Sequence, residues 1–153
     1  MIEIVSKIPL VMPEYKLDAK ALTDLGKALE GSVLGNIKNQ EQADGSRLKP
    51  NPPGYARQKR AAGWGSRSLV AGEHSLVKGQ GKSFTYSYNV ASSTVTLRPT
   101  PGDAAERSEH VQERGYTGWL GIGERAVAAM KQVMFDFIAR ATKNAARKRR
   151  PRG

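Results

Sequence analysis

Five large aliphatic side chains recur at helical spacing near the start of the chain, and this stripe constrains the fold more than any other feature. They are Leu22, Leu25, Leu29, Val33 and Ile37. Steps of three and four residues place them on one face of a helix. We expect this helix to run from about residue 18 to about residue 40, with Asp18 as its N-cap. The stripe must be buried against another layer of the protein.

Three glycines interrupt this predicted helix, at Gly26, Gly31 and Gly35. Each is expected to weaken an isolated helix by up to about 1 kcal/mol relative to alanine. Packing of the apolar face, rather than intrinsic helix propensity, is therefore predicted to hold this segment in its helical form.

A β-hairpin is predicted for residues of about 83–99. Four apolar side chains alternate with polar ones and are expected on the core face of the first strand: Phe84, Tyr86, Tyr88 and Val90. Such alternation is typical of a half-buried strand. Ser92 and Ser93 can turn the chain, Val95 and Leu97 mark the returning strand, and Pro99 ends it.

Two further helices are predicted in the second half of the chain. A short one extends from an Asp103 cap to about Arg114, where Gly115 suits a helix C-terminus. A long one spans about 124–145, because apolar residues recur there at steps of three and four. These residues are Val127, Met130, Val133, Met134, Phe137, Ile138 and Ala141. Residues 2–12 are expected to be extended, ended by Pro13.

Together these patterns predict an α+β fold. An antiparallel sheet is built around the central hairpin (about 83–99) and packed by the long N-terminal helix (about 18–40) and the C-terminal helix (about 124–145). Prolines and glycines, with an Asp44-Gly45 turn signal, make residues 41–82 a long basic loop with room for one helical turn at 54–62. With 153 residues, we expect a single domain, 1–142, followed by a basic tail, 143–153.

The composition predicts a thin core and excludes cysteine chemistry. Ile, Leu, Val and Phe together make up only about 20% of the residues, a share near the margin of stable folding for a charged chain. Stability from neighbouring subunits is therefore plausible. The absence of cysteine excludes disulfides, cysteine-ligated zinc, iron–sulfur clusters and thiol catalysis.

The net charge of +11 is concentrated in two segments. Residues 47–70 hold 6 basic and no acidic side chains, and residues 143–153 also hold 6 basic and none acidic. Such blocks favour a polyanionic or acidic partner. The candidate contact residues to an assembly partner or to DNA are Arg47, Lys49, Arg57, Lys59, Arg60, Arg147, Lys148, Arg149, Arg150 and Arg152. For the tail, phosphate contact and a merely solvated end both remain open.

Three motifs suggest chemistry but lack parts of the required pattern. The segment GQGKS at 79–83 resembles a phosphate-binding loop, yet Leu76 occupies a required glycine position and a strand follows. One predicted helix face carries Glu106, Glu109, His110 and Glu113, which more simply form ion pairs with nearby arginines than bind a metal. GEHS at 72–75 lacks a nucleophile elbow. We expect no enzyme activity, no cofactor and no metal.

Trp119, in the glycine-rich segment GWLGIG, has two interpretations. Its indole can anchor local packing, or it can fill a pocket of a neighbouring subunit, so it joins the candidate contact residues. A membrane partner is not expected, because no apolar run approaches the roughly 18 residues of a membrane span. The first residues also lack the basic-then-apolar order of a signal peptide, which favours synthesis in a cytoplasm.

The order of these elements, with two groups of short motifs, resembles the tailed-bacteriophage virion morphogenesis family of tail-completion or neck proteins. The first group comprises Asp44, Gly45, Pro50, Tyr55 and Lys59. The second group precedes the last helix and comprises Val111, Gln112, Gly115, Leu120 and Gly121. The resemblance spans roughly residues 18–142.

The resemblance implies a virion structural protein that forms a ring, commonly a hexamer, at the head–tail junction. Its implied partners are copies of itself, other neck, connector and tail proteins, and the genomic DNA that passes through the lumen. It implies a place in the virion, with assembly in the host cytoplasm. The alternative hypothesis is a small basic nucleic-acid-binding protein that contacts phosphates through its C-terminal tail.

Overall fold

The computed structural model describes residues 4–7, 16–69, 83–92, 94–116 and 118–148. In chain order these residues form β1 (Ile4–Lys7), α1 (Ala19–Asn39), α2 (Pro53–Ala61), β2 (Phe84–Asn89), β3 (Thr94–Pro99), α3 (Asp103–Glu113) and α4 (Glu124–Lys148). The predicted α+β class is confirmed, including both long helices. Within these ranges, no helix is long and apolar enough to cross a membrane.

The sheet is antiparallel, with the strand order β1-β3-β2. The predicted hairpin is confirmed: Tyr86 lies opposite Leu97 and Tyr88 opposite Val95. On the other side of β3, Ile4 of β1 is paired with Leu97. The expectation of an extended segment at 2–12 therefore holds for Ile4–Lys7, and its other residues lie outside the described ranges.

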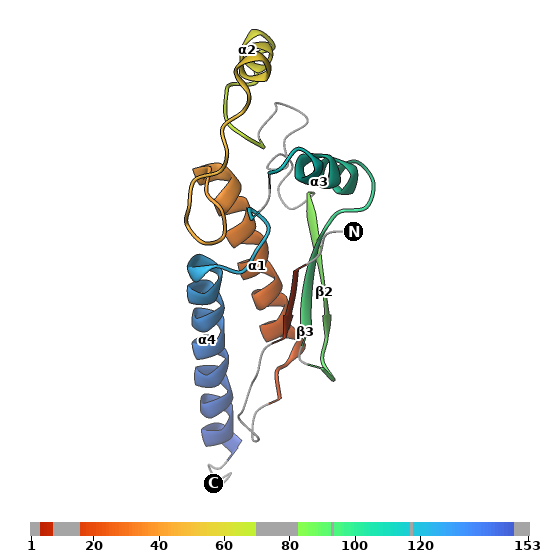
Figure 1. Ribbon diagram of the computed structural model, residues 1–153. Coiled ribbons are helices and arrows are strands. Elements are labelled where there is room, and N and C mark those ends of the chain that lie inside the picture. Colours follow the sequence, from red (N-terminus) through yellow and green to blue (C-terminus); the bar gives the residue numbers. More distant parts are fainter. Residues whose placement is uncertain (1–3, 8–15, 70–82, 93, 117, 149–153) are drawn as a thin grey trace.

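Helix α1 is the middle layer of the molecule. It packs against β2 and β3 on one side and against α4 on the other, and Figure 1 shows this order of sheet, α1 and α4. The stripe is buried as predicted, since all five of its side chains are at most 1% exposed. Burial of each such side chain contributes about 1.5–3 kcal/mol, which offsets the low helix propensity of the glycines.

The ends of α1 are fixed by side chains. The Asp18 carboxylate accepts the Ala21 amide at 2.7 Å, so the predicted cap is confirmed. At the other end, Gln40 has a left-handed backbone with φ of 59°. Its side-chain Nε2 donates to Ile37 O at 2.7 Å. The helix therefore ends seven residues before the first basic side chain of the segment 47–70.

Two details of the sequence prediction are wrong. Tyr88 and Val90 are 43% and 50% exposed rather than in the core, because β2 ends at Asn89 and these residues lie at the turn end of the hairpin. Asp103 is the first residue of α3 rather than its cap. Its carboxylate instead accepts from Arg107 at 3.0 Å, one turn along the helix.

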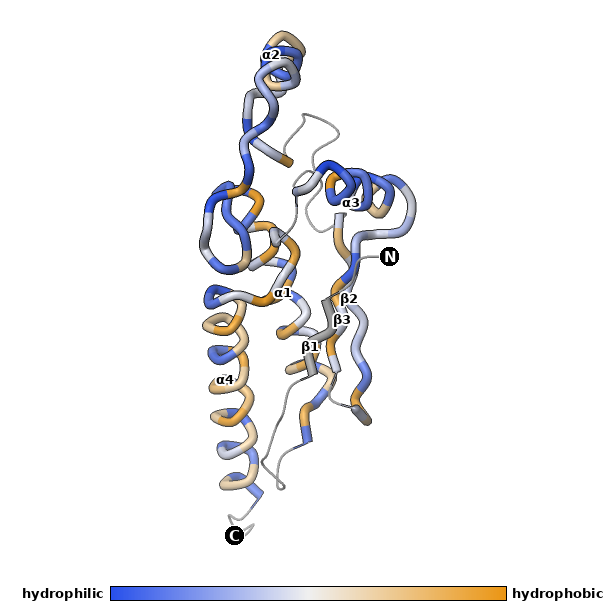
Figure 2. Tube along the Cα trace, viewed as in Figure 1, coloured by the Kyte–Doolittle hydropathy of each residue, from blue (hydrophilic) through white to orange (hydrophobic). Residues whose placement is uncertain are grey.

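Helix α4 ends three residues beyond the expected position, at Lys148. The first part of the predicted basic tail is therefore helical. Figure 2 shows apolar residues along much of α4, interrupted by hydrophilic ones. Among its side chains, only Ala126 and Phe137 are fully buried.

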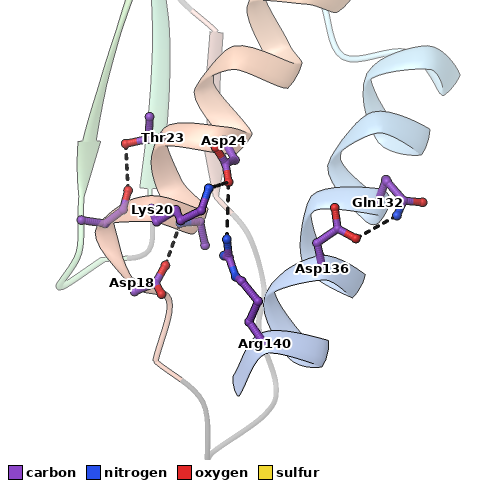
Figure 3. Close-up of polar contacts among 9 residues, drawn as sticks. Asp18, Lys20, Thr23, Asp24, Gln132, Asp136 and Arg140 are labelled. Carbon is purple, nitrogen blue, oxygen red and sulfur yellow. Dashed lines mark hydrogen bonds and ion pairs between the residues drawn. The ribbon is translucent and has the colours of Figure 1, made fainter. Parts of the chain in front are cut away.

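Polar contacts fix α4 against α1 at both ends of their interface. Near the start of α1, Asp24 accepts from Lys20 at 2.9 Å and pairs with Arg140 of α4 at 3.8 Å, as Figure 3 shows. At the other end, Arg125 of α4 donates to Asn36 at 3.1 Å and to Glu41 at 2.7 Å. These pairs set the register of the two helices over the apolar core.

Candidate functional site

Residues 47–68, which we call the basic arm, project from the body of the molecule and carry α2 at their end (Figure 1). The arm contains the exposed basic side chains Arg47, Lys49, Arg57, Arg60 and Arg67. No acidic residue lies between positions 47 and 70. The arm is therefore a cationic surface whose charge is not neutralised by its own sequence.

Hydrogen bonds close the base of the arm. Both polar atoms of the Gln40 side chain contact the Ser68 backbone: Nε2 donates to Ser68 O at 2.9 Å, and Oε1 accepts from Ser68 N at 2.6 Å. The Ser68 hydroxyl donates to Lys49 O at 2.7 Å. Further out, Asn51 donates to Ser66 O at 2.9 Å. The two chain segments of the arm are thus joined to each other and to the end of α1.

The predicted contact residue Lys59 is not part of the cationic surface. Its side chain is 2% exposed, and the ammonium group donates a hydrogen bond to Arg67 O. Burial lowers the pKa of this ammonium group from its ordinary value. Lys59 therefore folds inward to hold the two segments of the arm together, which corrects its expected role as an exposed contact.

An apolar pocket lies where the arm meets the end of α3. Its volume is 390 Å³, and its lining residues are Lys49, Pro52, Tyr55, Arg114 and Tyr116. The Tyr116 hydroxyl donates to Asn51 Oδ1 at 3.0 Å, and burial raises the pKa of this phenol. The cations of Lys59 and Arg114 lie 5.6 and 5.4 Å from the centre of the Tyr55 ring, within range of cation–π attraction.

Trp119 packs inside its own chain. The indole is fully buried, its centroid is 6.2 Å from that of Phe84, and its N–H donates to Tyr116 O at 3.1 Å. Its carbonyl accepts from Asn36 at 3.2 Å. The local packing interpretation is therefore confirmed. Trp119 is not available to fill a neighbour's pocket, which corrects its place among the candidate contacts.

The last turn of α4 lies far from the arm, at the opposite end of the molecule in Figure 1. Arg147 and Lys148 are exposed in the last turn of α4, where cations are favoured by the helix dipole. Arg149, Arg150 and Arg152 lie outside the described residues. Within the described residues, the cations at the end of α4 are therefore separate from those of the arm.

The motifs weighed for catalysis or metal binding form no site in the described part of the chain. His110 Nδ1 and a carboxylate oxygen of Glu113 lie 3.7 Å apart on the exposed side of α3. Among the described residues, no group of three or more His, Asp or Glu side chains could hold a metal ion. The GEHS segment and residues 79–82 of GQGKS lie outside the described ranges.

Several residues of this region were missed by reasoning from sequence. Arg114 and Tyr116 are about 60 residues from Tyr55 along the chain, so no local pattern places them beside it. No sequence signal identifies Gln40, because the left-handed residue that ends a helix is usually glycine or asparagine. Its pairing with Ser68 depends on the path of the whole arm.

Comparisons with known proteins provide no further assignment. A scan against family models, a search of curated proteins and a search of solved structures each found no match.

Proposed function

We propose that this chain is a structural protein of a tailed-bacteriophage virion, a neck or tail-completion component that forms a ring at the head–tail junction and enables head–tail joining. The proposal starts from the motif resemblance described above. Its partners are copies of itself and the adjoining neck, connector and tail proteins. The role is structural, with no reaction, and the site of action is the virion after assembly in the host cytoplasm.

The basic arm is the observation that carries this proposal. It stands away from the three-layer core (Figure 1), but Gln40, Ser68 and Lys49 hold its base in one conformation. Connecting segments placed by a rigid scaffold carry binding residues more often than the elements they connect. A pre-ordered cationic arm loses little conformational entropy on docking, which suits a subunit that must join other proteins.

Particle assembly tests the proposed role directly. In the phage that encodes the chain, loss of the protein is expected to leave unjoined heads and tails, visible by electron microscopy, and to abolish infectious particles. The wild-type chain supplied in trans should restore joining. Normal yields of joined particles without the chain would contradict the proposal.

The charge of the arm is tested by Arg57→Glu combined with Arg60→Glu. Both side chains are exposed on α2, so the fold should be retained while docking to an acidic partner weakens. Lys16→Glu with Lys27→Glu provides a matched control, because both lysines are exposed outside the arm and the charge change is the same. Joined-particle yields should fall for the α2 variant and remain near wild type for the control.

A second candidate function is phosphate contact with nucleic acid. The exposed cations of the arm, with Arg147 and Lys148 at the other end, favour it. Phosphate contacts release counterions, so affinity for duplex DNA should fall steeply as salt rises, with a log–log slope of about −0.9 for each contact. A salt titration of binding by the full chain tests this. Weak binding that does not depend on salt would contradict it.

A further inference from the structure

The outer side of α4 carries the most exposed large apolar side chain in the described part of the molecule. Phe135 is 65% exposed. Its neighbours on this side include Ala128, two turns before, and Ala139, one turn after, and both are small and exposed. The residues one turn before it, Lys131 and Gln132, are also exposed, so the phenyl ring lies on an open side of the helix. We call this side chain the α4 knob.

The pocket beside Tyr55 offers a complementary shape. Pro52, Tyr55 and Tyr116 supply apolar surface, and the volume of 390 Å³ lies within the range of about 300–1,000 Å³ typical of small-ligand sites. A single aromatic side chain fits within such a volume. The knob and the pocket belong to different surfaces of the chain, because one is on α4 and the other is between the arm and α3.

Charges beside the two features also match. Asp136 follows the knob, is exposed, and accepts from Gln132 at 3.0 Å, as Figure 3 shows. A carboxylate retains further acceptor sites after one hydrogen bond. The pocket is lined by the cations of Lys49 and Arg114. A phenyl ring with a neighbouring carboxylate is thus what an apolar pocket with two cations would accept.

We propose that Phe135 of one copy inserts into the Tyr55 pocket of a second copy, while Asp136 pairs with Lys49 and Arg114 of that copy. The inference rests on the proposed ring and names its subunit contact. Because knob and pocket are different surfaces, the contact is heterologous. Such contacts produce a closed ring when the rotation between copies closes, and an open filament when it does not.

A second copy fits this pocket better than a nucleobase does. The described surface of the same chain supplies the required aromatic group and carboxylate side by side. Nucleic acid in the pocket is therefore an alternative outcome of the test, detected as competition by an oligonucleotide.

The first test measures self-association of the full chain by native mass spectrometry and analytical ultracentrifugation. Phe135→Ala and Arg114→Glu should each raise the dissociation constant, the former on the order of thirtyfold or more, as expected of a buried aromatic anchor. Both side chains are exposed in the single chain, so circular dichroism should show wild-type folding. Tyr88→Ala, at another exposed aromatic, is the matched control and should associate normally.

Mixing the two variants distinguishes this contact from a symmetric one. The Phe135→Ala chain keeps an intact pocket, and the Arg114→Glu chain keeps an intact knob. Together they should form a one-to-one dimer and nothing larger, although each alone stays monomeric. A charge exchange provides the converse test: Asp136→Arg should weaken association, and its combination with Arg114→Glu should restore a large part of it.

The outcomes separate this inference from the proposed function. If the wild-type chain assembles and Phe135→Ala assembles equally well, the knob-and-pocket contact is wrong while the ring remains. A wild-type chain that stays monomeric at every concentration would also overturn the contact, and the particle assay then decides the proposed role independently. Displacement of the partner copy by an oligonucleotide at the pocket would assign the pocket to nucleic acid instead.

Discussion

Helices α1 and α4 carry apolar stripes with the same spacing but have different depths of burial. The stripe of α1 is at most 1% exposed along its whole length, whereas only Ala126 and Phe137 of α4 are fully buried. The difference follows from position, because α1 lies between the sheet and α4, and α4 is covered by α1 on one side. Periodicity thus predicts which face of a helix needs a partner, but not how completely that partner covers it.

This comparison predicts a large difference in stability between two truncations. Leu29→Ala should lower the free energy of unfolding by about 2–5 kcal/mol, because it leaves a cavity in the middle layer. Phe135→Ala should change the stability of the monomer by no more than about 0.5 kcal/mol, as for an ordinary surface site. Urea unfolding at a concentration where the chain is monomeric measures both. Equal losses would show that α4 is covered on both sides.

Two glycines of α1, Gly26 and Gly31, allow a buried and an open position to be compared within one helix. A Cβ at Gly26 would overlap the ring of Tyr86, so Gly26→Ala should cost about 1–3 kcal/mol through overpacking. A Cβ at Gly31 meets no atom within 4 Å. Gly31→Ala should therefore stabilise the protein by up to about 1 kcal/mol through helix propensity. Thermal unfolding of both variants tests the expected opposite signs, and a loss at Gly31 would contradict them.

Removal of the cap of α1 should have an intermediate effect. Asp18→Ala leaves the Ala21 amide without its acceptor and should cost about 1 kcal/mol. Asp18→Ser provides the control, because serine is also a good N-cap residue. The two variants should differ in urea midpoint, with serine close to wild type. An equal loss of stability in both variants would show that the negative charge of Asp18, rather than its hydrogen bond to Ala21, stabilises the helix.

The smallest expected effect is the pH dependence of the stability that Asp24 of α1 contributes. The hydrogen bond from Lys20 lowers the pKa of Asp24, assisted by the charges of Lys27 and Arg140, while desolvation opposes them. A lowered pKa in the folded state gives stability that is present above the ordinary value of 3.8 and is lost as pH falls through the lowered pKa. We expect a fraction of 1 kcal/mol at this partly exposed pair.

The Asp24→Asn variant isolates this contribution. Unfolding of both proteins is followed by urea titration from neutral pH to about pH 2, the range over which a lowered carboxyl pKa acts. The difference between them should be constant at neutral pH and shrink as the acid limit is approached. A difference that stays constant throughout would show that the carboxylate has no lowered pKa.

The local elements could be predicted from sequence because short-range physics specifies them. The stripe from Leu22 to Ile37, the Asp18 cap and the alternation around Tyr86 each depend on residues a few positions apart. The α+β class followed from their order. The errors are Tyr88, which is exposed because its strand ends at the next residue, and Lys59, which is buried and bonded to Arg67 O across the arm.

Only part of the candidate site could be predicted from the sequence. The excess of positive charge at 47–70 is visible in the sequence, and most of these side chains are exposed. The pocket was not visible, because Tyr55, Arg114 and Tyr116 come together only through the packing of the arm against the end of α3. Trp119 was left with two interpretations, and its full burial decided between them.

The sequence by itself determined the two amphipathic helices, the hairpin and the location of the charge, since spacing and composition act locally. Three outcomes were decided by tertiary structure alone. The α1 stripe is buried on both sides, Gly26 has no room for a side chain, and the side chain of Lys59 is buried. These outcomes depend on the atoms that a side chain meets from another part of the chain. Close packing makes such contacts specific, and no local pattern encodes them.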